Sequence, residues 1–199
     1  EGDTIFFIAA PEKAACIYAG QIRNELGSRL DLLEKDAYRF CYINDFPMYE
    51  IDEETGKLGF THNPFSMPQG GLEALNEKDP LDILAYQYDI VCNGVELSSG
   101  AVRNHDMEIM EKAFDIAGYD KETLKDKFGA LYNAFQFGAP PHAGMAPGVD
   151  RMIMLLRNEE NIREIIAFPM SGTAQDLMCG APNEITEQQL REVHIKVRD

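Results

Sequence analysis

The segment Tyr86–Val102 constrains the fold more than any other part of the chain. Residues Tyr86–Cys92 follow the alternating pattern of a strand, Asn93-Gly94 comes next, and the pattern resumes at Val95. Asn-Gly between two such runs is a strong signal for a two-residue type I′ turn. We therefore predict a β-hairpin here, and with it an antiparallel sheet.

The predicted hairpin brings two acidic residues together. A two-residue loop places Cys92 opposite Val95, and counting back from this pair puts Asp89 and Glu96 on one face. Two carboxylates on one sheet face repel each other unless a cation or a substrate lies between them. Spacing alone leaves two interpretations equally open: two solvated acids, or a Mg²⁺ site that holds substrate phosphates.

Arg103 ends the returning strand of this hairpin. It is either a surface arginine or a guanidinium that grips a carboxylate or phosphate with two hydrogen bonds. Strict alternation would place Arg103 on the face opposite Glu96. A β-bulge near Ser98-Ser99-Gly100 would return it to the Glu96 face, since glycine tolerates that geometry.

A second candidate region is Gly144–Arg151 (GMAPGVDR), which leads into a short apolar helix predicted at Val149–Leu156. The start of a helix favours anions, and an arginine in its first turn suggests a triphosphate. The residues alone slightly favour a different interpretation, in which Arg151 pairs with a nearby carboxylate such as Asp150.

His62 precedes Asn63–Gly71 (NPFSMPQGG), where prolines and glycines exclude regular structure. An irregular stretch beside a histidine is a candidate binding loop. The other three histidines share no metal-ligand spacing with His62, so we assign no metal to the histidines.

The rest of the chain mixes strands with separate helices, which predicts an α+β fold built on an antiparallel sheet. The polar run Glu34-Lys35-Asp36 is a possible domain boundary. Further strands are predicted at Thr4–Ile8, Arg39–Asn44, Leu58–Thr61 and Val193–Val197, and helices at Ala15–Leu26, Met107–Ala117 and within Asp120–Phe137. Thr186 with Gln189 indicates a capping box.

The amino-acid composition excludes some classes of binding partner. The chain has 199 residues with 18 Lys and Arg against 34 Asp and Glu, a net charge of -16. This charge argues against a general binder of DNA or other polyanions, which needs clustered cations. The apolar runs fall well short of the roughly 20 residues that a membrane span needs. Four scattered cysteines without a C-x-x-C pair indicate a reducing cytoplasm.

Six segments in order along the chain carry a resemblance to a known family. They are DFPMYE (Asp45–Glu50), HNPFSMP (His62–Pro68), YDIVCNGVELSSGAVR (Tyr88–Arg103), APPHAGMAPGVDRMIMLL (Ala139–Leu156), IREIIAFP (Ile162–Pro169) and DLMCGAP (Asp176–Pro182). Together they resemble the aspartyl-tRNA synthetases of the bacterial type. The G-x-D-R at Gly148–Arg151 is similar to the third signature motif of class II synthetases.

The resemblance implies a fold and a reaction. The fold would be part of a class II catalytic domain, an antiparallel sheet flanked by helices. The reaction would be activation of L-aspartate by ATP to aspartyl-adenylate, followed by transfer to tRNA(Asp) by a homodimeric enzyme. Such a reaction needs charge neutralised on the phosphates and a nucleophile held in line.

The resemblance also implies roles for single residues. Asp89 and Glu96 match the acidic pair that holds Mg²⁺ and ATP, and Arg103 and His62 match the residues at the aspartate side-chain carboxylate. Arg151 matches the arginine on the γ-phosphate. Glu96 and Arg151 are thus the expected catalytic residues, and the ATP site is expected to comprise Glu96, Gly148, Val149, Asp150 and Arg151.

The chain also departs from the family pattern. Asn63, Pro147 and Met170 stand where a histidine, a phenylalanine and a lysine are usual. Residues 1–33 resemble the end of the inserted (GAD-like) domain, and residues 34–199 the C-terminal part of the catalytic domain with the third motif. The first two class II motifs and the anticodon-binding domain have no match, so we expect a fragment that is inactive alone.

Two alternatives remain. One is a non-catalytic synthetase-like module with a binding or regulatory role. The other is an asparaginyl-type ligase of the same fold. Arg103 favours an aspartate-specific site, because a guanidinium matches a carboxylate and not an amide.

Overall fold

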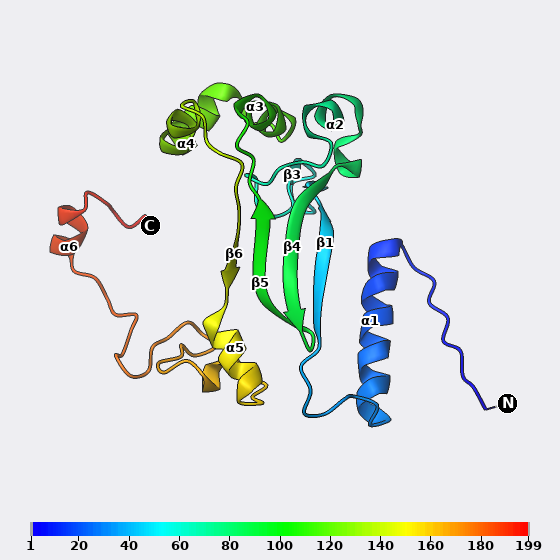
Figure 1. Ribbon diagram of the computed structural model, residues 1–199. Helices are drawn as coiled ribbons and strands as arrows, with labels where there is room; N and C mark the ends of the chain where they lie inside the picture. The colour runs from blue at the N-terminus through cyan, green and yellow to red at the C-terminus, as the bar shows by residue number, and fades with distance from the viewer. Residues whose placement is uncertain (1, 199) are drawn as a thin grey trace. The chain divides into compact units, whose positions relative to one another are not determined.

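The computed structural model describes residues 2–198 (Figure 1). They form two compact units, one extending to Arg39 and the other beginning at Phe40. In the first unit, helix α1 (Glu12–Arg29) follows Pro11 as its N-cap and continues through Gly27. None of its residues is buried.

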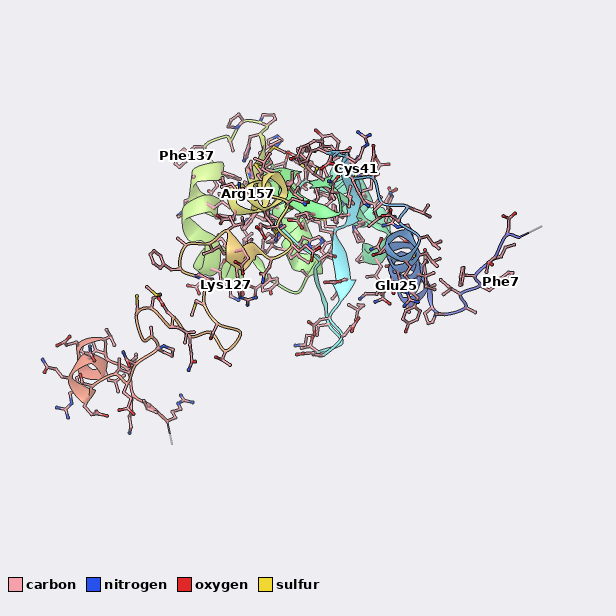
Figure 2. The ribbon with its side chains drawn as sticks, turned by 90° about the horizontal axis from the view of Figure 1, so that it is seen from below. Phe7, Glu25, Cys41, Lys127, Phe137 and Arg157 are labelled. Atoms are coloured by element: carbon pink, nitrogen blue, oxygen red, sulfur yellow. The ribbon has the colours of Figure 1, made fainter. Side chains whose placement is uncertain are left out.

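The strand predicted at Thr4–Ile8 is wrong. These residues belong to no helix or strand, and Phe7, on the segment that precedes α1 (Figure 2), is 91% exposed. The described residues of this unit include no second strand to pair with it. Strand propensity alone cannot satisfy the backbone hydrogen-bonding groups of a single segment, so this part of the chain stays irregular.

The second unit is built on the predicted antiparallel sheet, which has the order β1-β4-β5-β6. Its central pair confirms the hairpin, with Asn93 and Gly94 both at positive φ as a type I′ turn requires. A separate two-stranded ribbon joins β2 to β3. The strands are β1 (Phe40–Pro47), β2 (Tyr49–Ile51), β3 (Leu58–Phe60), β4 (Leu84–Cys92), β5 (Val95–Val102) and β6 (Ala143–Pro147).

Helices flank this sheet at its two ends. Figure 1 shows α2 (Gly71–Glu77), α3 (Met107–Ile116) and α4 (Lys121–Phe135) gathered at one end, while α5 (Val149–Leu156) follows β6 at the other. Together with the sheet they confirm the predicted α+β class. Short 3-10 turns occupy Pro80–Asp82 and Ile162–Glu164.

The core lies at the end of the sheet that α2, α3 and α4 cover. Met48, Tyr49 and Ile83 pack there against α2 and α3, and the buried Tyr49 hydroxyl donates to the Ala113 carbonyl over 2.9 Å. This burial raises the pKa of Tyr49. A second apolar cluster, centred on Phe114, joins α3 to α4.

A polar contact also fastens α3 to α4. The Glu111 carboxylate accepts from the Tyr132 hydroxyl over 2.6 Å and from Lys121 Nζ over 3.0 Å. Partial burial acts to raise the pKa of Glu111, but the hydrogen bonds from Lys121 and Tyr132 outweigh it and leave this pKa below its ordinary value. The carboxylate is therefore the favoured form at this contact.

The C-terminal segment confirms one prediction and corrects another. Helix α6 (Glu187–Glu192) begins with the predicted capping box of Thr186 and Gln189. The strand predicted at Val193–Val197 is wrong, because those residues have no strand partner. Among the residues that the structure describes, no helix has both the length and the apolar character to cross a membrane.

Candidate functional site

The hairpin register brings the two predicted acids to one face. Val91 lies opposite Glu96, and Asp89 lies two residues before Val91 on the same strand. Because side chains alternate along a strand, Asp89, Val91 and Glu96 share a face. The predicted placement of the two carboxylates is confirmed, and this surface is called the acidic face below.

A β-bulge determines the position of Arg103. Glu96 lies opposite Val91 but Ser98 lies opposite Ile90, so Leu97 is an extra residue in β5. The bulge shifts the alternation of β5 by one residue, which puts Ser99 opposite Asp89 and Arg103 on the acidic face. The sequence predicted such a bulge slightly later, at Ser98-Ser99-Gly100.

Small residues lie beside Asp89 on the acidic face. Ser99 and Ala101 of β5 lie opposite Ala146 and Gly144 of β6, respectively. Ser99 is exposed, whereas Ala101 is 1% exposed. Along the acidic face, small residues of β5 therefore separate Glu96 from Arg103.

Arg151 reaches the acidic face from the first turn of α5. Gly148, the N-cap of α5, donates its backbone N–H to the Leu97 carbonyl over 2.7 Å, which fixes the helix start against the bulge. Arg151 Nη1 donates to the Glu96 carbonyl over 2.8 Å and lies 3.2 Å from Glu96 Oε1. The carboxylate that pairs with Arg151 is thus Glu96, and the suggested pairing with Asp150 is wrong.

The Arg151–Glu96 ion pair is open to solvent, with the two side chains 45% and 47% exposed. An exposed ion pair contributes at most about 1 kcal/mol. An anion at Arg151 or a cation at Glu96 can therefore replace it at little cost. Val149 and Asp150, the other predicted nucleotide contacts, are exposed at the same helix start.

His62 lies on a loop that is tied to the strand end bearing Arg103. Ser66 forms a β-bridge with Arg103, and Asn104 N–H donates to the Phe65 carbonyl over 2.7 Å. The His62 ring is exposed and meets Phe46 edge-on, with 5.1 Å between ring centroids. The predicted irregular loop is confirmed, and its backbone runs beside Arg103.

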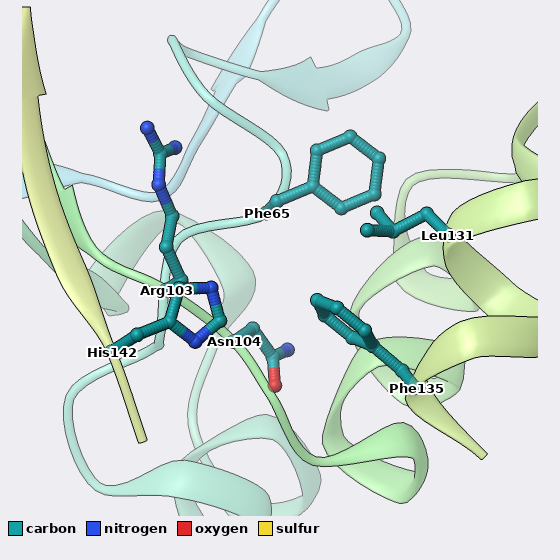
Figure 3. A pocket seen from close by; sticks show the side chains of 6 residues that line it. All are labelled: Phe65, Arg103, Asn104, Leu131, Phe135 and His142. Carbon is teal, nitrogen blue, oxygen red and sulfur yellow. The ribbon is translucent and has the colours of Figure 1, made fainter. Parts of the chain in front are cut away.

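A small pocket opens next to Arg103, with a volume of about 210 Å³. Figure 3 shows Asn104, Phe135 and His142 around it, with the guanidinium of Arg103 directed away from these three side chains. Asn104 is 1% exposed, and its Nδ2 has no hydrogen-bond partner. The remaining lining residues are Phe65 and Leu131.

Sequence reasoning missed Asn104 and His142. The His142 carbonyl accepts from Arg103 N–H over 2.9 Å, so the pairing of β5 with the segment before β6 brings His142 to the pocket. The Pro-Pro-His run marked this histidine in the sequence, but nothing local showed which strand it would meet.

The donor groups fit a metal only together with a phosphate ligand. Within residues 2–198, no group of three or more His, Cys, Asp or Glu side chains could hold a metal ion. Mg²⁺ commonly takes one or two carboxylates from a protein and completes its shell with water and substrate phosphates. Asp89 and Glu96 on one face match that requirement.

Comparisons with a family model and with known proteins agree on one family. Residues 12–172 match the family model of class II tRNA synthetases (D, K and N). The chain is 60% identical over 197 residues to an aspartate–tRNA(Asp/Asn) ligase of Zymomonas mobilis, covering 99% of this chain and 33% of that protein. It is 61% identical to an aspartate–tRNA ligase of Streptomyces avermitilis, covering 99% and 34%.

A solved structure shows the same fold. The aspartyl-tRNA synthetase of Entamoeba histolytica matches with a TM-score of 0.52 and 24% identity, over 88% of this chain and 29% of that one. The chain spans about a third of the length of the curated relatives above.

Proposed function

Because this chain belongs to the class II tRNA synthetase family of the D, K and N type, we propose that it is the C-terminal part of the catalytic domain of an aspartate–tRNA ligase. The complete enzyme would activate L-aspartate with ATP and transfer it to tRNA(Asp). We place it in the cytoplasm as a homodimer. Residues 1–33 would end the inserted domain, and residues 34–199 would carry the third class II motif.

The observation that supports this proposal most is the shared face of the sheet. The Leu97 bulge puts Arg103 on the same side as Asp89 and Glu96, and α5 adds Arg151. The two arginines and the two carboxylates provide charges of both signs beside small residues. Such a set suits a zwitterionic amino acid next to a nucleotide. Unrelated surface charges would have no reason to share one face of the sheet.

The proposed roles follow from charge and position. Arg103, with His62 on the adjoining loop, would hold the side-chain carboxylate of L-aspartate through charge-assisted hydrogen bonds. Arg151 would leave Glu96 and bind the terminal phosphate, while Gly148, Val149 and Asp150 line the nucleotide site. Asp89 and Glu96 would hold Mg²⁺, which when bound neutralises phosphate charge.

The competing asparaginyl-type function fits less well. Arg103 is half-buried at the strand end, and a carboxylamide cannot satisfy a guanidinium as a carboxylate does. The aspartate relatives cover nearly the whole chain at about 60% identity, which also favours aspartate as the substrate.

Exchange of pyrophosphate into ATP tests the proposal. The full-length ligase that contains this segment should give exchange that depends on L-aspartate and not on L-asparagine. The 199-residue chain alone should give none, since the described site supplies no cation for the α-phosphate besides those already assigned. Dependence on asparagine, or turnover by the isolated chain near that of the full-length enzyme, would contradict the proposal.

A further inference from the structure

One buried amide joins the two parts of the proposed amino-acid site. Gln87 lies on β4 two residues before Asp89, and its register partner is Ala101, two residues before Arg103. It therefore belongs to the acidic face, yet it is only 6% exposed. A polar side chain that is buried this far needs hydrogen-bond partners.

The partners of Gln87 are both on the loop that carries His62. Its Nε2 donates to the Ser66 hydroxyl over 2.8 Å and to the Asn63 carbonyl over 3.3 Å. Asn63 directly follows His62, and Ser66 is the residue that forms a β-bridge with Arg103. Both protons of one amide thus connect the loop to the sheet.

Backbone bonds hold part of the loop: Asn104 N–H donates to the Phe65 carbonyl over 2.7 Å and Met67 N–H to the Val102 carbonyl over 2.9 Å. At Asn63, by contrast, the hydrogen bonds that the structure describes, other than the one from Gln87, lie within the turn. Asn63 Oδ1 accepts from Phe65 N–H over 2.9 Å, and the Asn63 carbonyl accepts from Ser66 N–H over 3.2 Å. These bonds shape the turn, but they do not hold the Asn63 end against the sheet. Ser66 is fully buried, so loss of the Gln87 amide would leave its hydroxyl without this donor.

We infer that Gln87 is a positioning residue for amino-acid recognition, which fixes the His62 loop against the strand end that carries Arg103. The inference rests on the proposed function, in which His62 and Arg103 hold the aspartate carboxylate. Gln87 touches no reacting atom. Its effect is to set the relative position of the two groups, and small displacements of positioning groups have large effects on binding.

Kinetics of the full-length ligase test the inference, using Gln87→Met, which keeps the length of the side chain and removes its donors. The KM for L-aspartate should rise about tenfold or more, while kcat and the KM for ATP change less than about twofold. Ser66→Ala should raise the same KM by less, because it removes only one of the two hydrogen bonds that Gln87→Met removes. The double variant should be no worse than Gln87→Met alone, since the two changes share that contact.

Gln69→Met is the matched control. Gln69 is in the same irregular stretch, but its amide donates to Asp45 Oδ1 over 2.6 Å and not to the His62 turn. The KM of the Gln69→Met enzyme for L-aspartate should therefore stay unchanged. An unchanged KM in Gln87→Met, or equal loss for aspartate and ATP, would overturn the inference. Absence of aspartate-dependent exchange in the unsubstituted enzyme would overturn the proposed function, and the inference with it.

Discussion

Replacement of Arg103 by leucine should abolish most aspartate activation by the full-length ligase. Arg103 is the cation at the end of the acidic face, beside the His62 loop. Removing one partner of a desolvated charge pair costs about 2–5 kcal/mol. Since 1.36 kcal/mol is tenfold in rate, kcat/KM for L-aspartate should fall by roughly 30-fold to several thousandfold in pyrophosphate exchange.

Arg103→Lys separates charge from geometry. Lysine keeps the charge but loses the planar fork that matches a carboxylate with two bonds. We expect it to recover only part of the activity, with the KM for ATP unchanged in both variants. Wild-type kcat/KM for L-aspartate in Arg103→Leu would show that the carboxylate binds elsewhere.

Gly100→Ala should have the largest effect on stability. Gly100 lies on the face opposite the acids, and a Cβ there would collide with the Gly144 carbonyl oxygen and come within 2.6 Å of the Tyr88 ring. The Tyr88 hydroxyl donates to that same carbonyl over 3.0 Å. Overpacking of this kind costs about 1–3 kcal/mol, so thermal unfolding should begin several degrees lower.

Gly129→Ala is the control for this change. Gly129 lies within α4, and a Cβ there meets nothing within 4 Å. Gly129 directly follows the kink of α4 at Phe128. The gain is therefore at most the roughly 0.5–1 kcal/mol by which alanine is favoured over glycine inside a helix, and the variant should be no less stable than the original. Equal melting temperatures for Gly100→Ala and the original chain would refute the close contact of β4, β5 and β6.

The sequence was most informative where the structure is local. The Asn93-Gly94 turn, the helix Val149–Leu156 and the Thr186 capping box each depend on a few adjacent residues, and each is present as predicted. The strands predicted at Thr4–Ile8 and Val193–Val197 had equally good patterns. They are absent because a strand needs a partner, which local sequence does not specify.

The charged groups could be named from the sequence, but their arrangement could not. The face occupied by Arg103 depends on one extra residue, Leu97, and a one-residue shift sends every later side chain of a strand to the other face. Gln87 had no local signal, and the Pro-Pro-His run before β6 did not show which strand His142 would meet, because the significance of both residues comes from the segments they meet across the sheet. Arg151 likewise pairs with Glu96 of β5 and not with the adjacent Asp150, because the pairing depends on how α5 lies against the sheet.

The most direct test of the shared site is a crystal structure of the full-length ligase with a non-hydrolysable aspartyl-adenylate analogue and, separately, with ATP and Mg²⁺. The aspartyl carboxylate should lie against Arg103, and the ATP phosphates should lie between Arg151 and the Asp89–Glu96 pair, on one side of the sheet. Ligands on the opposite side of the sheet, or contacts to only one of these four residues, would contradict the account.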